Sequence, residues 1–255
     1  MLVDKPAGPT SFAMVSQVRD RYGTKAGHAG TLDPFATGLL LCLLGPATRL
    51  SRYLVGLDKH YLTEIRLGIR TSTGDGEGHV VEDTPMPSVA EIKALEGEVE
   101  LPVPRASAVK IEGERAYRLH RRGIAVKMPV RRSTVHRLEI LRFEPPLLEL
   151  DLRVSSGTYI RSLADALGGH CRTLRRTAVG PFRIEDADEE LVLPPLAAVV
   201  MYPAHELSDA EARLVRTGRP LAGRAEGPVA LFSGDTLIAV GTGDGTMIQP
   251  ETVLP

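Results

Sequence analysis

Aromatic residues and cysteine are scarce in this chain of 255 residues, which has no tryptophan, five phenylalanines and two cysteines. So few rings argue against an extended platform on which successive unpaired bases could stack. Two cysteines are too few for a zinc site, and a disulfide framework is not expected. Cys42 lies in an apolar run and is predicted to be a small buried hydrophobe.

Long hydrophobic runs are also missing, since no apolar stretch approaches the roughly 20 residues that span a membrane. The first residues carry no basic segment followed by an apolar one, which is the pattern of a secretory signal. We therefore expect a cytoplasmic protein with no membrane contact.

Net charge is small, −1, but the charges are segregated along the chain. Residues 105–142 contain eleven lysines or arginines against three acids, whereas residues 184–255 contain four arginines against twelve acids. The local field of such a basic block attracts a polyanion even when the whole protein is neutral. A solvated charged surface without a ligand is the alternative.

Residues 4–9 are expected to form a loop, since two prolines and a glycine cannot hold regular structure. After it, periodicity and turn residues predict short helices and strands in alternation. Thr10 can cap a helix that Gly23 ends, and Thr158 can cap a helix with a buried stripe that leaves Arg161 outside it. Strands are expected over 39–44, 61–69, 135–143, 148–154, 173–182, 229–232 and 237–240. Further helices are expected over 46–55, after Ser88, and over 114–122 and 208–217.

The stretch Gly27–Gly38 concentrates glycines around one histidine and one acid, directly before an apolar block. Glycine permits sharp turns, and Pro34 biases Asp33 toward an extended backbone. An acid held at the end of a buried segment is a candidate catalytic group. The alternative is that Asp33 caps a helix beginning at Pro34.

The sequence of this stretch, GHAGTLDPFATG, closely resembles the active-site motif of the TruB-type tRNA pseudouridine synthases. Further motifs match in the same order: LVDKP at residue 2, DKHY at 58, SAVK at 107, SGTYIR at 156 and LRR at 174. The resemblance extends to about Phe182. It implies an α+β fold, with a mixed, largely antiparallel sheet flanked by helices, and a small C-terminal β-rich PUA-like module.

The resemblance also implies an activity and its residues. Asp33 would be the essential carboxylate, Tyr61 would stack on the target base, and Arg161 would pair with Asp33. The substrate would be uridine 55 in the T-arm of tRNA, flipped out of its stack. No cofactor or metal is implied, and we expect a monomer. The expected RNA-contacting or supporting residues are Lys5, His28, Lys110 and Leu174.

Each assignment has a simpler alternative. Arg161 could be a surface cation paired with Asp165, Tyr61 a core residue, and His28 a turn residue. A guide-RNA-dependent synthase, a non-catalytic RNA-binding protein and aspartyl-phosphate chemistry at Asp33 are the competing functions; the last needs magnesium-binding acids, and none are suitably spaced.

Domain organisation is expected to comprise a catalytic domain over 1–202 and a short C-terminal module over 203–255. Residues at about 102–132 are predicted to form a basic arm that settles on the RNA, because they are weakly apolar and rich in cations. Residues 71–78 are predicted to be a loop without a phosphate or calcium role.

Overall fold

The computed structural model describes residues 1–255, which form two compact units. Unit 1 comprises residues 1–34, 38–55 and 181–255, and unit 2 comprises residues 35–37 and 56–180. Both contain helices and mostly antiparallel strands, so the predicted α+β class is confirmed. None of the helices combines the length and the apolarity needed to cross a membrane.

The first part of unit 1 is a small antiparallel sheet of β1 (Leu2–Lys5), β3 (Thr37–Leu44) and β2 (Ala26–Ala29), with β3 between the other two. Helix α1 (Ser11–Tyr22) contributes Met14, Val15 and Val18 to the apolar cluster that includes Leu40 and Cys42 of β3. As predicted, Thr10 caps α1 by accepting a hydrogen bond from the Ala13 amide, and Gly23 ends it in the left-handed conformation.

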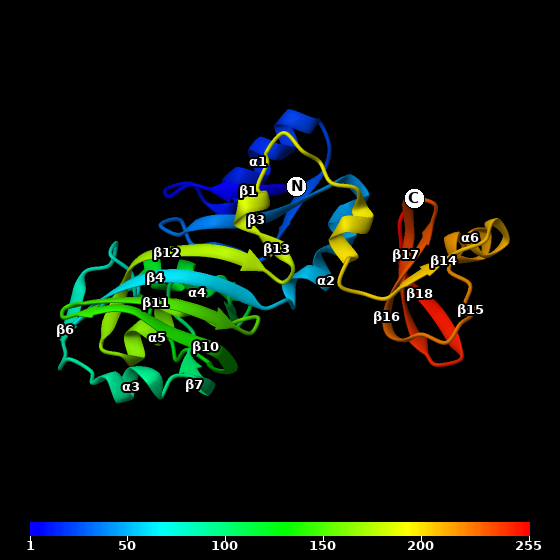
Figure 1. The fold of residues 1–255 in the computed structure, drawn as a ribbon. Coiled ribbons are helices and arrows are strands. Elements are labelled where there is room, and N and C mark those ends of the chain that lie inside the picture. Colours follow the sequence, from blue (N-terminus) through cyan, green and yellow to red (C-terminus); the bar gives the residue numbers. More distant parts are fainter. The chain divides into compact units, whose positions relative to one another are not determined.

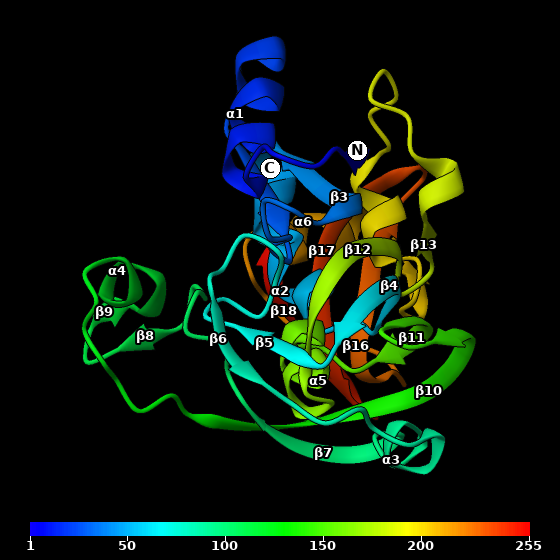
Figure 2. The same ribbon diagram turned by 90° about the vertical axis from the view of Figure 1, so that its left-hand side faces the viewer.

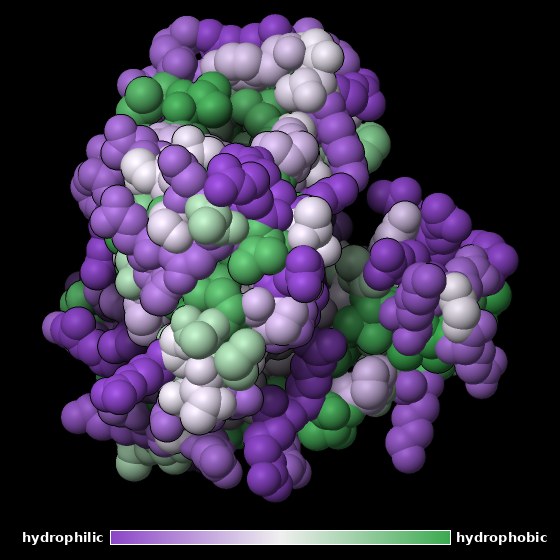
Figure 3. All heavy atoms as spheres, turned by 90° about the vertical axis from the view of Figure 1, so that its right-hand side faces the viewer, coloured by the Kyte–Doolittle hydropathy of each residue, from purple (hydrophilic) through white to green (hydrophobic).

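The C-terminal part of unit 1 is a second sheet with the strand order β14-β16-β17-β18-β15. Helix α6 supplies Ala212 and Val215 to its apolar cluster. Figure 3 shows hydrophilic and hydrophobic residues intermixed on one face of the molecule. A curled sheet of this kind fits a PUA-like module. Its elements are β14 (Ala204–Glu206), α6 (Asp209–Arg216), β15 (Leu221–Ala222), β16 (Glu226–Ser233), β17 (Thr236–Asp244) and β18 (Met247–Val253).

Short helices connect the two sheets of unit 1. Leu50 from this region shares an apolar cluster with Val240 and Leu254 of the C-terminal sheet, and Tyr53 donates or accepts a hydrogen bond with Thr252 at 2.9 Å. The predicted domain boundary at about residue 203 stays a prediction. The connecting elements are the 3-10 helices η1 (Gly45–Leu50), η2 (Ile184–Asp186) and η3 (Pro195–Val199), helix α2 (Ser51–Val55) and strand β13 (Phe182–Arg183).

Unit 2 is built on an antiparallel sheet with the order β12-β4-β11-β10-β7, whose strands lie side by side in Figure 1. Helix α5 packs against β12 and β7. Strand β4 alternates as predicted, with Tyr61, Thr63, Ile65 and Leu67 buried. The elements are β4 (Lys59–Leu67), β7 (Gly97–Pro102), β10 (Val130–Glu144), β11 (Leu147–Val154), α5 (Ile160–Ala166) and β12 (Gly169–Val179).

Two excursions leave this sheet. The hairpin of β5 (Ile69–Thr71) and β6 (Val80–Asp83) leads to helix α3 (Val89–Lys93), which begins with the predicted capping box of Ser88 and Glu91. The arm, residues 103–129, connects β7 to β10 and carries β8 (Lys110–Ile111), β9 (Glu114–Arg115) and α4 (Ala116–Arg121). Figure 2 shows β8, β9 and α4 at the end of a long connection away from the sheet.

Several local expectations are wrong. Asp4 and Lys5 belong to β1 rather than to a loop, because their backbones pair with Leu39 and Gly38. Thr158 does not cap α5: its hydroxyl donates to the Ser155 carbonyl at 2.9 Å, and Tyr159 is the N-cap residue. Strand β12 begins at Gly169, four residues before the expected start.

Candidate active site

Asp33 lies in a half-buried, irregular loop between β2 and β3, so it does not cap a helix. Gly30 and Gly38 both have positive φ values, 92° and 101°, which residues with a side chain rarely adopt. The glycines of this motif are therefore needed to bend the backbone on both sides of the acid. The loop presents the Asp33 carboxylate between two rigid strands.

The first eleven residues hold this loop in place. Ser11 donates its hydroxyl to the Leu32 carbonyl at 2.9 Å and accepts a hydrogen bond from the Leu32 amide at 2.8 Å. Lys5, which is fully buried, donates Nζ to the carbonyls of Pro34 at 3.1 Å and Pro6 at 2.9 Å. Both neighbours of Asp33 are thus fixed, and Lys5 acts as a support for the loop.

Tyr61 lies on β4, between β12 and β11 in the unit 2 sheet. It lies opposite Leu152 of β11 on one side and Arg176 of β12 on the other, and only 8% of it is exposed. Leu174 lies opposite Thr63, so it shares a sheet face with Tyr61 at a diagonal position. The structure therefore brings two of the predicted site residues, Tyr61 and Leu174, close together on one face of the sheet. The buried cation Arg176 of β12 lies directly opposite Tyr61.

Arg161 is 3% exposed, so the predictions that it lies off the buried stripe or on the surface are wrong. The guanidinium donates from Nη1 to the Thr73 carbonyl at 2.6 Å and from Nη2 to the Ala106 carbonyl at 2.9 Å. Asp165, the alternative partner, pairs instead with Arg70 at 3.6 Å. Burial raises the pKa of Asp165, and the Arg70 charge opposes that rise. Arg161 is therefore a desolvated, fixed cation.

Asp75 is a partner of Arg161 that the sequence analysis missed. Its Oδ2 lies 3.7 Å from Arg161 Nη1, and its side chain is 8% exposed. The Thr73 hydroxyl and the Glu77 amide donate to Asp75 Oδ1 at 2.5 Å and 3.1 Å. This loop, for which no phosphate or calcium role was predicted, therefore orients Arg161. The signal was an aspartate in a run of Ser, Thr and Gly residues, whose amides and hydroxyls can satisfy a buried carboxylate.

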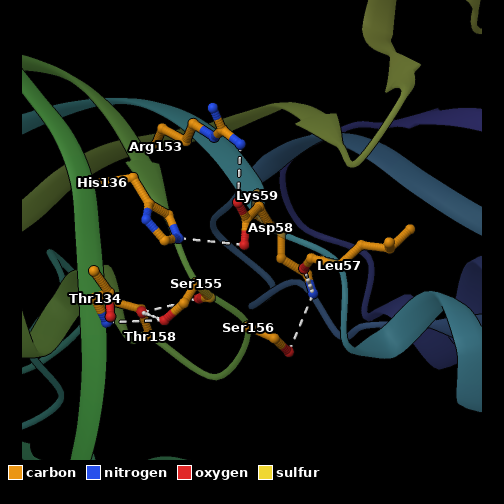
Figure 4. Close-up of polar contacts among 9 residues, drawn as sticks. All are labelled: Leu57, Asp58, Lys59, Thr134, His136, Arg153, Ser155, Ser156 and Thr158. Carbon is orange, nitrogen blue, oxygen red and sulfur yellow. Dashed lines mark hydrogen bonds and ion pairs between the residues drawn. The ribbon is translucent and has the colours of Figure 1, made fainter. Parts of the chain in front are cut away.

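The Asp58-Lys59 motif connects β4 to the loop before α5 (Figure 4). Asp58 pairs with His136 at 3.3 Å and with Arg153 at 3.1 Å. Lys59 is buried and donates Nζ to the Leu57 carbonyl at 2.5 Å and the Ser156 hydroxyl at 3.3 Å. Burial and the nearby Arg176 charge lower the pKa of Lys59 to about 8.

The Ser155–Thr158 loop is also held from the opposite side. Ser155 accepts a hydrogen bond from the Thr134 amide at 2.9 Å and donates its own amide to the Thr134 carbonyl at 2.8 Å. Since this loop leads directly into α5, the contacts fix the start of the helix that carries Arg161.

The remaining predicted residues lie in different settings. His28 is half-buried in β2 opposite Cys42, and Lys110 is exposed on β8 of the arm. The predicted pairing of Asp33 with Arg161 joins residues of the two units and stays a prediction. No group of three or more histidine, cysteine, aspartate or glutamate side chains is arranged to hold a metal ion.

A cavity of about 750 Å³ lies within unit 2 between the arm, the β5–β6 hairpin and α5. Arg161 forms part of its wall, and cationic side chains outnumber the acids Glu82 and Asp165 around it. The basic and imidazole residues in the lining are Arg70, His79, Arg105, His120, Lys127 and Arg161.

Comparison with known proteins identifies relatives along nearly the whole chain. The model of the TruB family pseudouridylate synthase N-terminal domain matches residues 19–160. A protein of Thermobifida fusca named tRNA pseudouridine synthase B is 42% identical over 284 aligned positions, covering 99% of this chain and 97% of its own. Its namesake in Aromatoleum aromaticum is 40% identical and covers 96% of this chain and 88% of its own.

Among solved structures, one of a Cbf5-Nop10-Gar1 complex is similar to 99% of this chain and 84% of its own, with a TM-score of 0.72 and 27% identity. The arrangement of sheets and the sequence matches lead to the same conclusion. The chain belongs to the TruB family of pseudouridylate synthases and is an isomerase.

Proposed function

We propose that this enzyme converts uridine 55 in the T-arm of tRNA to pseudouridine. The observation that carries the proposal is the 42% identity, over 99% of the chain, to a protein named tRNA pseudouridine synthase B. The basic arm supports a polyanionic substrate, since eleven cations oppose three acids between residues 105 and 142.

In the proposed reaction, the bond from ribose C1′ to base N1 breaks, and a bond from C1′ to C5 forms after the base rotates. The proton at C5 is lost, and N1 gains one, so the net change is an isomerisation. The reacting atoms are inaccessible in a stacked helix, and the nucleotide must first be flipped out at a cost of a few kcal/mol. Asp33 acts as the anion that attacks the ribose or removes a sugar proton.

Arg161 and Tyr61 complete the proposed catalytic set. A guanidinium beside the Asp33 carboxylate would stabilise its ionised form. The Arg161 guanidinium has a fixed orientation, because it is buried and hydrogen-bonded to the Thr73 and Ala106 carbonyls. Tyr61 stacks on the extruded base, and Leu174, on the same sheet face, packs against that base.

Roles in RNA contact or in support of the site are proposed for three further residues. Lys110 on the exposed part of the arm meets phosphates, His28 fills the space the base has left, and Lys5 supports the Asp33 loop. The enzyme is proposed to act as a monomer in the cytoplasm, without a cofactor.

A guide-dependent enzyme is the second candidate, because the Cbf5-Nop10-Gar1 structure shares the fold over 99% of this chain. The higher identity of the relatives named tRNA pseudouridine synthase B favours the first proposal. A guide-dependent enzyme would not act on bare tRNA, which separates the two candidates.

The test measures release of tritium from uridine C5 in a T-arm hairpin, with neither guide RNA nor metal added. We expect release by the native enzyme and none by Asp33→Asn, while the affinity for the hairpin changes little. Asp20→Asn, at an exposed position of α1 in the same unit, is the matched control and should retain native turnover. Near-native turnover by Asp33→Asn would disprove the catalytic assignment.

A further inference from the structure

The arm is closed at its base and attached to helix α5. The Val103 amide donates to the Pro129 carbonyl at 2.9 Å, so both ends of the arm are fixed to each other. Just beside this closure, the Ser162 hydroxyl donates to the Pro102 carbonyl at 2.6 Å. Ser162 is 7% exposed, and a hydrogen bond in such a dry setting has no water to replace it.

Arg161, the residue before Ser162, binds the arm itself, a few residues after Pro102. Arg161 Nη2 donates to the carbonyl of Ala106 at 2.9 Å, inside the first turn of the arm. Two consecutive residues of α5 therefore bind two carbonyls that are four positions apart, that of Pro102 at the end of β7 and that of Ala106 in the root of the arm. Movement of the root of the arm, its first residues up to Ser107, therefore changes what the Arg161 guanidinium can contact.

Arg161 is held on its other side by the 71–77 loop. Nη1 reaches the Thr73 carbonyl at 2.6 Å and lies 3.7 Å from Asp75. The loop is itself anchored, since the Thr71 hydroxyl donates to the Asp75 carbonyl at 2.6 Å. One half of the fork thus faces a fixed loop, and the other half faces the arm, which extends away from the sheet (Figure 2).

A second observation concerns the root of the arm. The Ser107 hydroxyl, directly after Ala106, is buried and makes no hydrogen bond. A buried hydroxyl without a partner disfavours the conformation that contains it. The Ser107 hydroxyl therefore does not help to hold the root of the arm in its present arrangement.

We propose that Ser162 is a positioning residue that couples the arm to Arg161. This inference rests on the function proposed above. Ser162 keeps α5 in register with the root of the arm, so that the Ala106 carbonyl stays on the Arg161 fork while the arm is engaged with RNA. Without the hydroxyl, the engaged arm draws that carbonyl away, and Arg161 loses one of the acceptors that orient it.

The test compares Ser162→Ala, Ser162→Thr and Ser88→Ala. The control, Ser88→Ala, also loses a hydroxyl that is hydrogen-bonded to the backbone, in this case by accepting from the Glu91 amide, but it lies at α3, outside the arm and the site. We expect Ser162→Ala to lower the single-turnover rate of the T-arm hairpin about tenfold and to change its affinity less than about twofold. Ser162→Thr keeps the hydroxyl and should recover most of the rate, and Ser88→Ala should keep the native rate.

A double variant tests whether Ser162 acts through Arg161. In an Arg161→Lys background the planar guanidinium is already lost. Adding Ser162→Ala to it should therefore lower the single-turnover rate by less than about twofold further. If the fold-losses in rate of Ser162→Ala and Arg161→Lys multiply in full in the double variant, the proposal is overturned. A native rate for Ser162→Ala, or equal losses of its rate and its RNA affinity, would also overturn it.

Hydrogen exchange gives a readout that does not depend on activity. The backbone amides from Val103 to Tyr117 should exchange faster in Ser162→Ala than in the native enzyme and in Ser88→Ala. Unchanged exchange there would refute the coupling even if the enzyme proved inactive on the hairpin. Failure of the native enzyme to release tritium would refute the proposed substrate instead.

Discussion

The Asp75 carboxylate is the residue-scale feature that most changes the view of this site. It is buried beside Arg161, and it accepts hydrogen bonds from Thr73 and Glu77 within its own loop. A buried guanidinium needs a counter-charge and acceptors, because desolvation of an ion is costly. Asp75 and two carbonyls meet part of this need before any substrate binds.

We expect Asp75→Asn to keep the shape of the loop and to remove the counter-charge. Hydrogen bonds and pairs that involve charged groups contribute about 1.5–3 kcal/mol, so the free energy of unfolding should fall by about 2 kcal/mol. Turnover should fall at least about tenfold, because Arg161 loses its fixed direction. Denaturant unfolding and tritium release measure the two effects. Glu77→Gln, exposed two residues later, is the control and should be close to native in both.

Lys59 makes stability depend on pH. Its pKa falls from the ordinary 10.5 to about 8 through burial and the Arg176 charge. Between these values the unfolded chain binds the proton that the folded protein has lost, so the free energy of unfolding rises with pH from about 8 to about 10.5. Lys59→Met should lack this rise, which urea unfolding at several pH values would measure. Lys93→Met on the exposed side of α3 should retain it, and an unchanged slope in Lys59→Met would contradict the assignment.

At the scale of elements, the 71–77 loop and the first turn of α5 form one structural piece. Gly74 has φ of +75°, and a Cβ built on it would lie 3.2 Å from Arg161 Cβ. A side chain at this position would be strained by the positive φ and would force the loop or Arg161 to shift by a few tenths of an ångström. The glycine therefore favours the contact between Asp75 and Arg161.

Gly74→Ala should destabilise unit 2 by about 1–2 kcal/mol through the left-handed backbone alone. The added methyl also pushes the loop away from Arg161, so turnover should fall further than RNA affinity. Gly76→Ala is a matched control, since its Cβ would meet nothing within 4 Å. Thermal unfolding and single-turnover rates distinguish the two variants, and equal behaviour would show that the close approach is unimportant.

At the scale of the whole molecule, charge is distributed unevenly over a chain with a net charge of −1. The cations gather between residues 105 and 142, much of which forms the arm, and the acids gather after residue 184. Counterion release makes phosphate contacts depend on salt in proportion to the number of contacts. A nearly neutral protein can therefore bind RNA in a strongly salt-dependent manner.

Lys110→Gln should weaken binding of the T-arm hairpin at low salt and reduce the slope of log affinity against log salt by about 1. The mutated lysine is exposed on β8. Lys93→Gln, on an acidic part of unit 2, removes the same charge and should leave the slope unchanged. Filter binding or fluorescence titration over a range of salt concentrations gives both slopes. Equal slopes for the two variants would remove the arm from the RNA interface.

Much of the local structure could be predicted from the sequence. The cap at Thr10, the capping box at Ser88 and the alternation along β4 all appear as predicted, because each depends on residues close together in the chain. The family motifs also located the Asp33 loop, whose glycine backbone conformations follow from residue type.

Which polar side chains are buried, and what they contact, could not be predicted in this way, because it depends on segments far apart in the chain. Arg161 and Asp75 lie 86 positions apart, and Ser162 and Pro102 lie 60 apart. Helical periodicity alone placed Arg161 off the buried stripe because it does not register the loop and arm that cover it. The free energy that a charged group or a hydroxyl contributes depends on its desolvation and on its hydrogen-bond partners. Both are properties of the packed molecule.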